Sequence, residues 1–341
     1  MKINQDKNEK INKLLIAILI TTIVVAIILM SIYVEQTSRA LKVIEDDSKD
    51  EYNNIYAFIT INPDDDFFEA VYESTRVAGK EHGDYVDFFG KDLATNYTRE
   101  ELLDIAISAK VDGIFLEADE SNEIIELINK AVKAGIPVVT MGGDATASLR
   151  QSFVGVNNFS LGQDYGRQIL KLADKDISNV MVLMTPNTAD TSQNIVFAAI
   201  HEQLESNGRS DIELQAVAID DASTFSVEES IRDIITKKHN LPDVLVCLSE
   251  SNTVSAYQAI VDYNRVGSID IIGYHENASI LDGISQHNIY ATFMVDTNQM
   301  GNYLIDAMDE YKEYGYVNEY MTVDVNLINS ENVEGYINEI E

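Results

Sequence analysis

The sequence contains a single cysteine, Cys247, and far fewer basic than acidic residues. One cysteine cannot form a disulfide within the chain, and no cationic neighbour is present to activate it, so we expect a buried strand residue rather than a reactive thiol. The 24 lysines and arginines are outnumbered by 57 acidic residues, which gives a formal charge of −33. This charge argues against nucleic-acid binding and against adhesion to anionic lipid, because both require basic side chains.

Common catalytic motifs are also missing. We find no HExxH, GxSxG, P-loop or CxxC pattern, and the five histidines are scattered at positions 82, 201, 239, 275 and 287. The sequence therefore predicts neither an enzyme nor a protein with a metal or cofactor. The lack of a helix-turn-helix module and the presence of an apolar segment exclude a transcription regulator.

The apolar segment at residues 14–34 contains no charged residue. A helix of this length spans a bilayer, so we predict a transmembrane helix. Lysines precede it and acidic residues follow it, which predicts a cytoplasmic tail at residues 1–13 and an extracytoplasmic stalk at residues 35–53. A cleaved signal peptide is the alternative, although the following residues make a poor cleavage site. No cysteine lies near the segment, which excludes a lipoprotein anchor.

About 290 residues follow the stalk, enough for two domains. Short apolar strands alternate along them with amphipathic helices, a pattern typical of parallel sheets covered by helices on both faces. We therefore predict an α/β protein of two doubly wound lobes. The predicted strands are 55–61, 85–89, 113–117, 136–141, 179–184, 213–219, 243–248 and 270–273, and the predicted helices are 67–80, 99–110, 121–134, 162–173, 193–206, 226–238 and 253–264.

Several segments in the same order resemble the type I periplasmic binding proteins of the ribose/galactose branch. They are Val111-Asp-Gly-Ile-Phe-Leu with Gly135-Ile-Pro-Val-Val-Thr, residues 152–162, Asp243-Val-Leu-Val-Cys-Leu-Ser-Glu with Ile271-Ile-Gly-Tyr, residues 289–301, and Glu331-Asn-Val. The resemblance implies two lobes joined by three crossings, with a solute bound between them. It places the crossings near Asn157–Asn158, near Val295–Asp296 and around residues 318–322. Lobe 1 would comprise residues 54–157 and 296–320, and lobe 2 residues 158–295 and 321–341.

In lobe 1 the resemblance implies ligand contacts after the first and fourth strands. Phe67 and Phe68 match a pair of stacking aromatics, although one of them could instead be core. Asp65 and Asp66 could accept hydrogen bonds from ligand hydroxyls or cap the following helix. Sugar-binding members commonly carry an Asp-Arg pair where this chain has Gly142-Gly143, and Asp144 could substitute for it.

The remaining candidate ligand-binding residues lie in lobe 2 and at the second crossing: Asp190, Gln193, Asn194, Ser249, Glu250, His275 and, at the crossing, Asp296. The arginine that the family often carries after residue 194 is replaced by Ile195. With no arginine there, and with Asp144, Glu250 and Asp296 nearby, we expect a neutral ligand rather than an anion. His275 is a hydrogen-bond partner more plausibly than a metal ligand.

Together these features predict a single-pass cell-membrane protein with a cytoplasmic N-terminus and an extracytoplasmic binding domain. The resemblance implies a solute-binding protein that closes on a sugar or polyol and delivers it to an ABC permease. The alternative is a ligand-sensing subunit that signals to a membrane histidine kinase.

Overall fold

The computed structural model of the chain describes residues 52–91, 97–172, 176–185, 191–220, 223–236 and 241–340. The predicted tail 1–13 and transmembrane helix 14–34 lie outside these residues, as does all of the predicted stalk 35–53 except its last two positions. Within the described ranges, no helix is both long and apolar enough to cross a membrane. The chain from Asn54 onward forms one unit.

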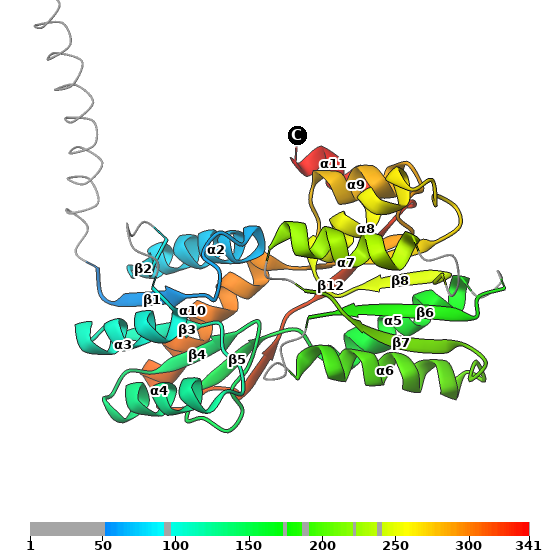
Figure 1. Ribbon diagram of the computed structural model, residues 1–341. Coiled ribbons are helices and arrows are strands. Elements are labelled where there is room, and N and C mark those ends of the chain that lie inside the picture. Colours follow the sequence, from blue (N-terminus) through cyan, green and yellow to red (C-terminus); the bar gives the residue numbers. More distant parts are fainter. Residues whose placement is uncertain are drawn as a thin grey trace, which may run out of the picture. The chain divides into compact units, whose positions relative to one another are not determined.

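Lobe 1 is built on a sheet with strand order β11-β5-β4-β3-β1-β2, in which all neighbours are parallel (Figure 1). Helices α2 and α10 cover one face, and α3 and α4 cover the other. Its elements are β1 (Ile55–Ile59), α2 (Asp66–His82), β2 (Tyr85–Phe88), α3 (Arg99–Ala109), β3 (Gly113–Leu116), α4 (Asn122–Lys133), β4 (Val138–Met141), β5 (Ser152–Gly155), α10 (Thr297–Tyr314) and β11 (Tyr320–Thr322).

Lobe 2 contains a second sheet with strand order β12-β10-β9-β8-β6-β7, parallel except for the antiparallel β10–β12 pair. Helices α5 and α6 pack on one face, and α7, α8, α9 and α11 on the other. Its elements are α5 (Asn158–Leu172), β6 (Asn179–Met184), α6 (Ser192–Ser206), β7 (Glu213–Ala218), α7 (Thr224–Thr236), β8 (Val244–Cys247), α8 (Glu250–Asp262), β9 (Asp270–Tyr274), α9 (Ala278–Ser285), β10 (Ala291–Val295), β12 (Val325–Asn329) and α11 (Val333–Ile340).

The alternation of side chains along the strands explains why both faces of each sheet are covered. In β1, Tyr56 and Phe58 pack toward α2 and α10, whereas Ala57 and Ile59 pack toward α3 and α4. All four side chains are fully buried. A strand that is apolar on both faces needs a helical layer on each side, and the βαβ connections supply it. The predicted α/β class with two doubly wound sheets is confirmed.

Three crossings connect the lobes. The first lies between β5 and α5, and the second between β10 and α10, as the resemblance implied. The third lies at Val323–Asp324, beyond the predicted region 318–322. Residues 320–322 still belong to lobe 1, because they pair with Phe153–Gly155 of β5 before the chain joins the other sheet.

Two helices of lobe 2 begin three or more residues earlier than predicted, at Asn158 and at Glu250. In both cases a side chain just before the helix accepts a hydrogen bond from a backbone N–H of the first turn. Asn157 Oδ1 accepts from Ser160 N at 3.0 Å, and Ser249 Oγ accepts from Asn252 N at 3.2 Å. Such N-caps satisfy donors that the helix itself leaves unpaired, so they fix the start of each helix.

Cys247 ends strand β8 and is fully buried in the core beneath α7 and α8. Burial raises the pKa of its thiol to about 12, because the thiolate would lose its solvation. The prediction of a buried, unreactive strand cysteine is confirmed.

Candidate functional site

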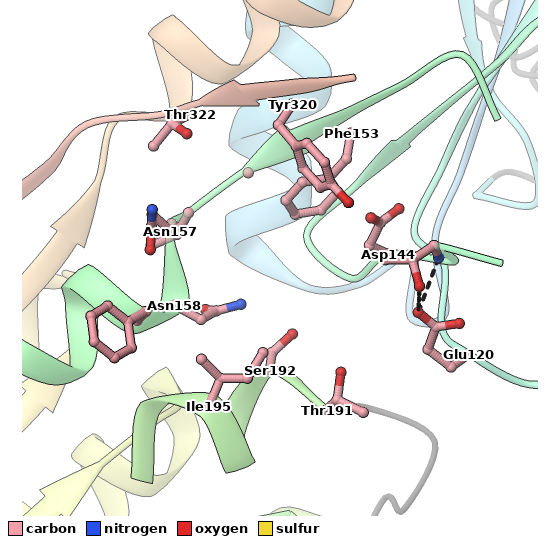
Figure 2. A pocket seen from close by; sticks show the side chains of 14 residues that line it. Glu120, Asp144, Phe153, Asn157, Asn158, Thr191, Ser192, Ile195, Tyr320 and Thr322 are labelled. Carbon is pink, nitrogen blue, oxygen red and sulfur yellow. Dashed lines mark hydrogen bonds between the residues drawn. The ribbon is translucent and has the colours of Figure 1, made fainter. Parts of the chain in front are cut away.

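A cavity of about 350 Å³ lies between the lobes, at the carboxyl ends of β4, β5 and β11 and facing the first turn of α6 (Figure 2). Its volume falls within the roughly 300–1,000 Å³ usual for small-molecule pockets. Parallel α/β sheets bind their ligands at this edge. The lining residues are Glu120, Asp144, Thr146, Phe153, Gly155, Val156, Asn157, Asn158, Phe159, Thr191, Ser192, Ile195, Tyr320 and Thr322. We call the boundary between the two lobes the seam, and the part of it that contains this cavity the cavity side.

An aromatic pair forms the lobe 1 wall of the cavity. Tyr320 of β11 lies directly opposite Phe153 of β5 in the parallel register, and the two rings meet edge to face with centroids 6.3 Å apart. Phe153 is buried, whereas Tyr320 is 52% exposed and therefore available to a ligand. A ring wall with a hydroxyl at its edge suits a molecule that has apolar faces and a polar rim.

The opposite wall consists of small polar side chains from lobe 2. Figure 2 shows the Ser192 hydroxyl pointing into the cavity from the first turn of α6, with Thr191 beside it. Thr191 stands at the N-cap of α6 but makes no capping hydrogen bond with its side chain. Asn157 and Asn158 add amide groups from the first crossing.

Two carboxylates are found among the lining residues, and both have protein partners. Glu120 accepts hydrogen bonds from the backbone N–H and the hydroxyl of Thr146. Asp144 forms a forked ion pair with Arg150, whose Nε lies 2.5 Å from Oδ1 and whose Nη2 lies 2.6 Å from Oδ2. Thr140 Oγ1 donates to Asp144 Oδ1 as well, at 2.7 Å.

Burial by itself lowers the pKa of Arg150, but the pairing with Asp144 raises it above its ordinary value. No arginine lines the cavity, as expected, but Arg150 pairs with the lining carboxylate Asp144 from outside it. The backbone explains why the pair stands at Asp144 and Arg150. Gly142 has φ +68°, and a Cβ there would lie 2.8 Å from the Phe68 ring; a Cβ on Gly143 would lie 2.2 Å from the Ala118 carbonyl oxygen. Neither position has room for a side chain.

Comparison with known proteins agrees with this architecture. The family described as periplasmic binding protein domain matches residues 56–315. The chain belongs to this family. The D-apiose import binding protein of Paraburkholderia graminis is 23% identical over 267 residues, which are 77% of this chain and 82% of that protein.

Solved structures of other proteins share the fold of this periplasmic binding protein. A solute-binding protein of Burkholderia graminis in complex with D-arabinose has a TM-score of 0.75 at 17% identity, covering 84% of this chain and 99% of that one. XylFII has a TM-score of 0.69 at 27% identity, covering 81% of this chain and 98% of that one. The match extends to the XylFII-LytSN complex, with a TM-score of 0.70 at 26% identity, covering 82% and 98%.

In this binding protein the lobes also touch directly, at a second place that we call the contact side. The ring of Phe67, at the start of α2, lies 4.2 Å from the ring of His275, which follows β9 (centroid to centroid, tilted by 33°). His275 has φ +62°, a left-handed conformation that is uncommon for residues with a side chain. Its backbone is held on both sides, because its N–H donates to Phe293 O at 2.7 Å and its carbonyl accepts from Thr292 Oγ1 at 2.6 Å. Burial lowers the pKa of its imidazole to about 3, so the ring is neutral at physiological pH.

Carboxylates from both lobes surround the contact side. Glu250 of α8 accepts a hydrogen bond from Asn277 Nδ2 at 2.5 Å. Burial raises the pKa of Glu250, and the nearby charges of Asp66 and Asp65 raise it further, while the bond from Asn277 opposes the shift. The fold therefore brings together the predicted residues Asp65, Asp66, Glu250, Phe67 and His275. Among the described residues, no group of three or more His, Cys, Asp or Glu side chains is arranged to hold a metal ion.

The predicted site residues thus divide into several groups. Asp144 lines the cavity, and five others meet at the contact side. Phe68 is 8% exposed and packs in the lobe 1 core. Ser249 and Asp296 cap α8 and α10, and Asp65 also caps α2 through Phe68 N.

The remaining predictions concern the loop before α6. Gln193 Oε1 accepts from Thr185 N at 2.8 Å, and Asn194 is exposed outside the cavity lining. Asp190 lies outside the described residues. From this part of the chain, Thr191, Ser192 and Ile195 line the cavity.

The sequence reasoning missed Phe153, Tyr320 and Arg150. Phe153 and Tyr320 are 167 positions apart in the chain, and only the β5–β11 pairing brings them together. Arg150 lies six residues beyond Asp144, outside any local motif. A possible signal was the isolated arginine between two strands that are otherwise apolar.

Proposed function

We propose that this chain is an extracytoplasmic solute-binding protein that closes on a sugar or a sugar-like polyol and delivers it to an ABC importer. The observation that carries this proposal is the cavity side. There an aromatic wall faces hydroxyl and amide groups, and the Asp144 carboxylate is neutralised by Arg150. A sugar offers matching apolar ring faces and hydroxyls, and buried polar groups in the site need such partners.

The similarity to the D-apiose import binding protein supports both the ligand class and the transport role. The test is a thermal-shift screen of the full-length chain against neutral pentoses, hexoses and polyols. A ligand at 100 times its Kd should stabilise the native protein by about 2.7 kcal/mol. A library of neutral sugars that leaves the melting temperature unchanged argues against the proposal.

We further propose that residues 14–34 anchor the protein in the cell membrane, with the binding lobes on the extracytoplasmic side. The uncharged length of this segment and the lysines before it support an uncleaved anchor. N-terminal sequencing of the mature protein tests this directly. A mature chain that begins after residue 34 would rule the anchor out.

A sensor that signals to a membrane histidine kinase is the second candidate function. The similarity to XylFII, which is also solved in a complex with LytSN, favours it. The two candidates differ in what the cell does with the sugar. Deletion of the gene abolishes uptake of the labelled sugar if the protein serves an importer, but abolishes only sugar-dependent transcription if it serves a sensor.

A further inference from the structure

Arg150 lies behind the wall of the cavity and is not one of the residues that line it. Its side chain is 3% exposed, and two of its nitrogens are committed to Asp144, at 2.5 and 2.6 Å. Asp144 itself does line the cavity. The charge of this carboxylate is therefore compensated from behind, by a cation that a ligand in the cavity does not contact.

The same guanidinium also supports the aromatic wall. Its centre lies 5.0 Å from the centroid of the Tyr320 ring, within the range of a cation–π interaction. Its Nη1 donates to Glu319 O at 3.1 Å, and the Phe153 N–H donates to that same oxygen at 2.9 Å. The planar fork of an arginine can make these contacts at once, whereas a lysine can supply the charge but not the geometry.

We infer that Arg150 is a positioning residue that makes this cavity select uncharged sugars over amino sugars, by neutralising Asp144 and holding the Tyr320 ring. The ligand class in this inference rests on the proposed function. With Arg150 present, Asp144 offers a paired carboxylate that can accept from a ligand hydroxyl. Without it, Asp144 is an uncompensated anion that attracts an ammonium group. Glu120, the other carboxylate that lines the cavity, is present with or without Arg150. Its contribution to amino-sugar binding is therefore the same in the wild type and in the Arg150 variants.

The test uses the full-length protein in detergent and two matched pairs of probes, D-glucose with D-glucosamine and D-galactose with D-galactosamine. Within each pair only one hydroxyl is replaced by an amine. Binding to the wild type, Arg150→Met, Arg150→Lys and the double variant Asp144→Asn/Arg150→Met is measured by calorimetry, after circular dichroism has shown that each variant is folded.

We expect Arg150→Met to raise the affinity ratio of amino sugar to neutral sugar by at least about tenfold, as one new charge-assisted hydrogen bond allows. The double variant should return this ratio to the wild-type value, because it lacks the anion. Arg150→Lys should keep the wild-type ratio but bind both sugars more weakly, because lysine keeps the charge and loses the support of Tyr320. This conservative variant also keeps the test decisive if Arg150→Met fails to fold.

An unchanged ratio in folded Arg150→Met, or a raised ratio in Arg150→Lys, overturns the inference. Failure of the proposed function gives a different result. If the wild type binds no neutral sugar while Arg150→Met gains affinity for an amino sugar, the role of Arg150 stands and the proposed ligand class falls.

Discussion

The cavity side and the contact side of the seam are both formed by residues near the ends of parallel strands, but only the cavity side leaves an open space between the lobes. On both, residues that follow parallel strands face residues from the other lobe. On the cavity side, paired polar groups and an edge-on aromatic wall leave about 350 Å³ open. On the contact side, Phe67 packs directly on His275. The fold thus determines where the lobes meet, whereas individual side chains determine where a ligand has room.

The strongest test of this difference is Tyr320→Ala on the cavity side. Loss of the exposed ring should weaken sugar binding by about ten- to a hundredfold, as removal of a large buried contact at a site usually does. Tyr316→Ala is the matched control, because Tyr316 is 69% exposed and does not line the cavity. The measurement is the Kd for sugar of both variants, by calorimetry. If Tyr320→Ala and Tyr316→Ala bind the sugar equally well, the ligand does not contact Tyr320.

His275 should make the contact side sensitive to acid. Its folded-state pKa of about 3 lies below the ordinary value of 6.5, so the unfolded chain takes up a proton first as the pH falls. Stability is therefore lost as the pH falls below about 6.5, by up to about 2 kcal/mol at pH 5. The raised pKa of Glu250 acts in the opposite sense, since it makes the native state bind the proton first.

His275→Asn should remove most of the loss between pH 7.5 and pH 5, measured by urea unfolding. Asparagine tolerates the left-handed conformation, so the backbone stays intact. His287→Asn is the control, because His287 is exposed and has a similar φ of +58°. Identical pH profiles for the wild type and His275→Asn would show that the folded protein does not lower the pKa of this imidazole.

Phe67→Ala should have a smaller effect than Tyr320→Ala. The aromatic contact with His275 is worth about 0.5–1.5 kcal/mol, so its loss should weaken closure and reduce sugar affinity between about two- and tenfold. The fold should persist, because Phe67 is only partly buried. If Phe67→Ala lost more sugar affinity than Tyr320→Ala, the ligand would bind at the contact side and not at the cavity side.

The smallest expected effect concerns Asp296, at the second crossing. Its carboxylate accepts from Gln299 N at 2.8 Å, so Asp296→Ala should cost about 1 kcal/mol of stability, whereas Asp296→Ser should retain the cap. Sugar affinity should stay within about twofold in both variants. A large loss of affinity in Asp296→Ser would identify a ligand contact in place of a cap.

The fold was largely predictable from the sequence, because each strand and helix carries its own periodicity and buries its own face. The candidate site was less predictable. Polar residues after strand ends serve as helix caps as readily as ligand contacts, and Asp65, Ser249 and Asp296 are all caps. Phe67 and Phe68 are adjacent on one helix and must face different ways, so only Phe68 enters the core.

The largest omissions depend on tertiary structure. Tyr320 reaches the cavity because β11 pairs with β5, and no local pattern encodes that pairing. The Asp144–Arg150 pair depends on how the chain folds between β4 and β5, after two glycines that have no room for side chains.

The lone buried thiol makes the protein suitable for optical work. Cys247 is shielded from reagents, so a cysteine introduced at an exposed position would be the one that a maleimide dye labels. With one exposed cysteine introduced in each lobe, a donor and an acceptor dye would report the distance between the lobes by energy transfer as a sugar is added. Binding and closure could then be followed in the same cuvette, without first removing the native cysteine.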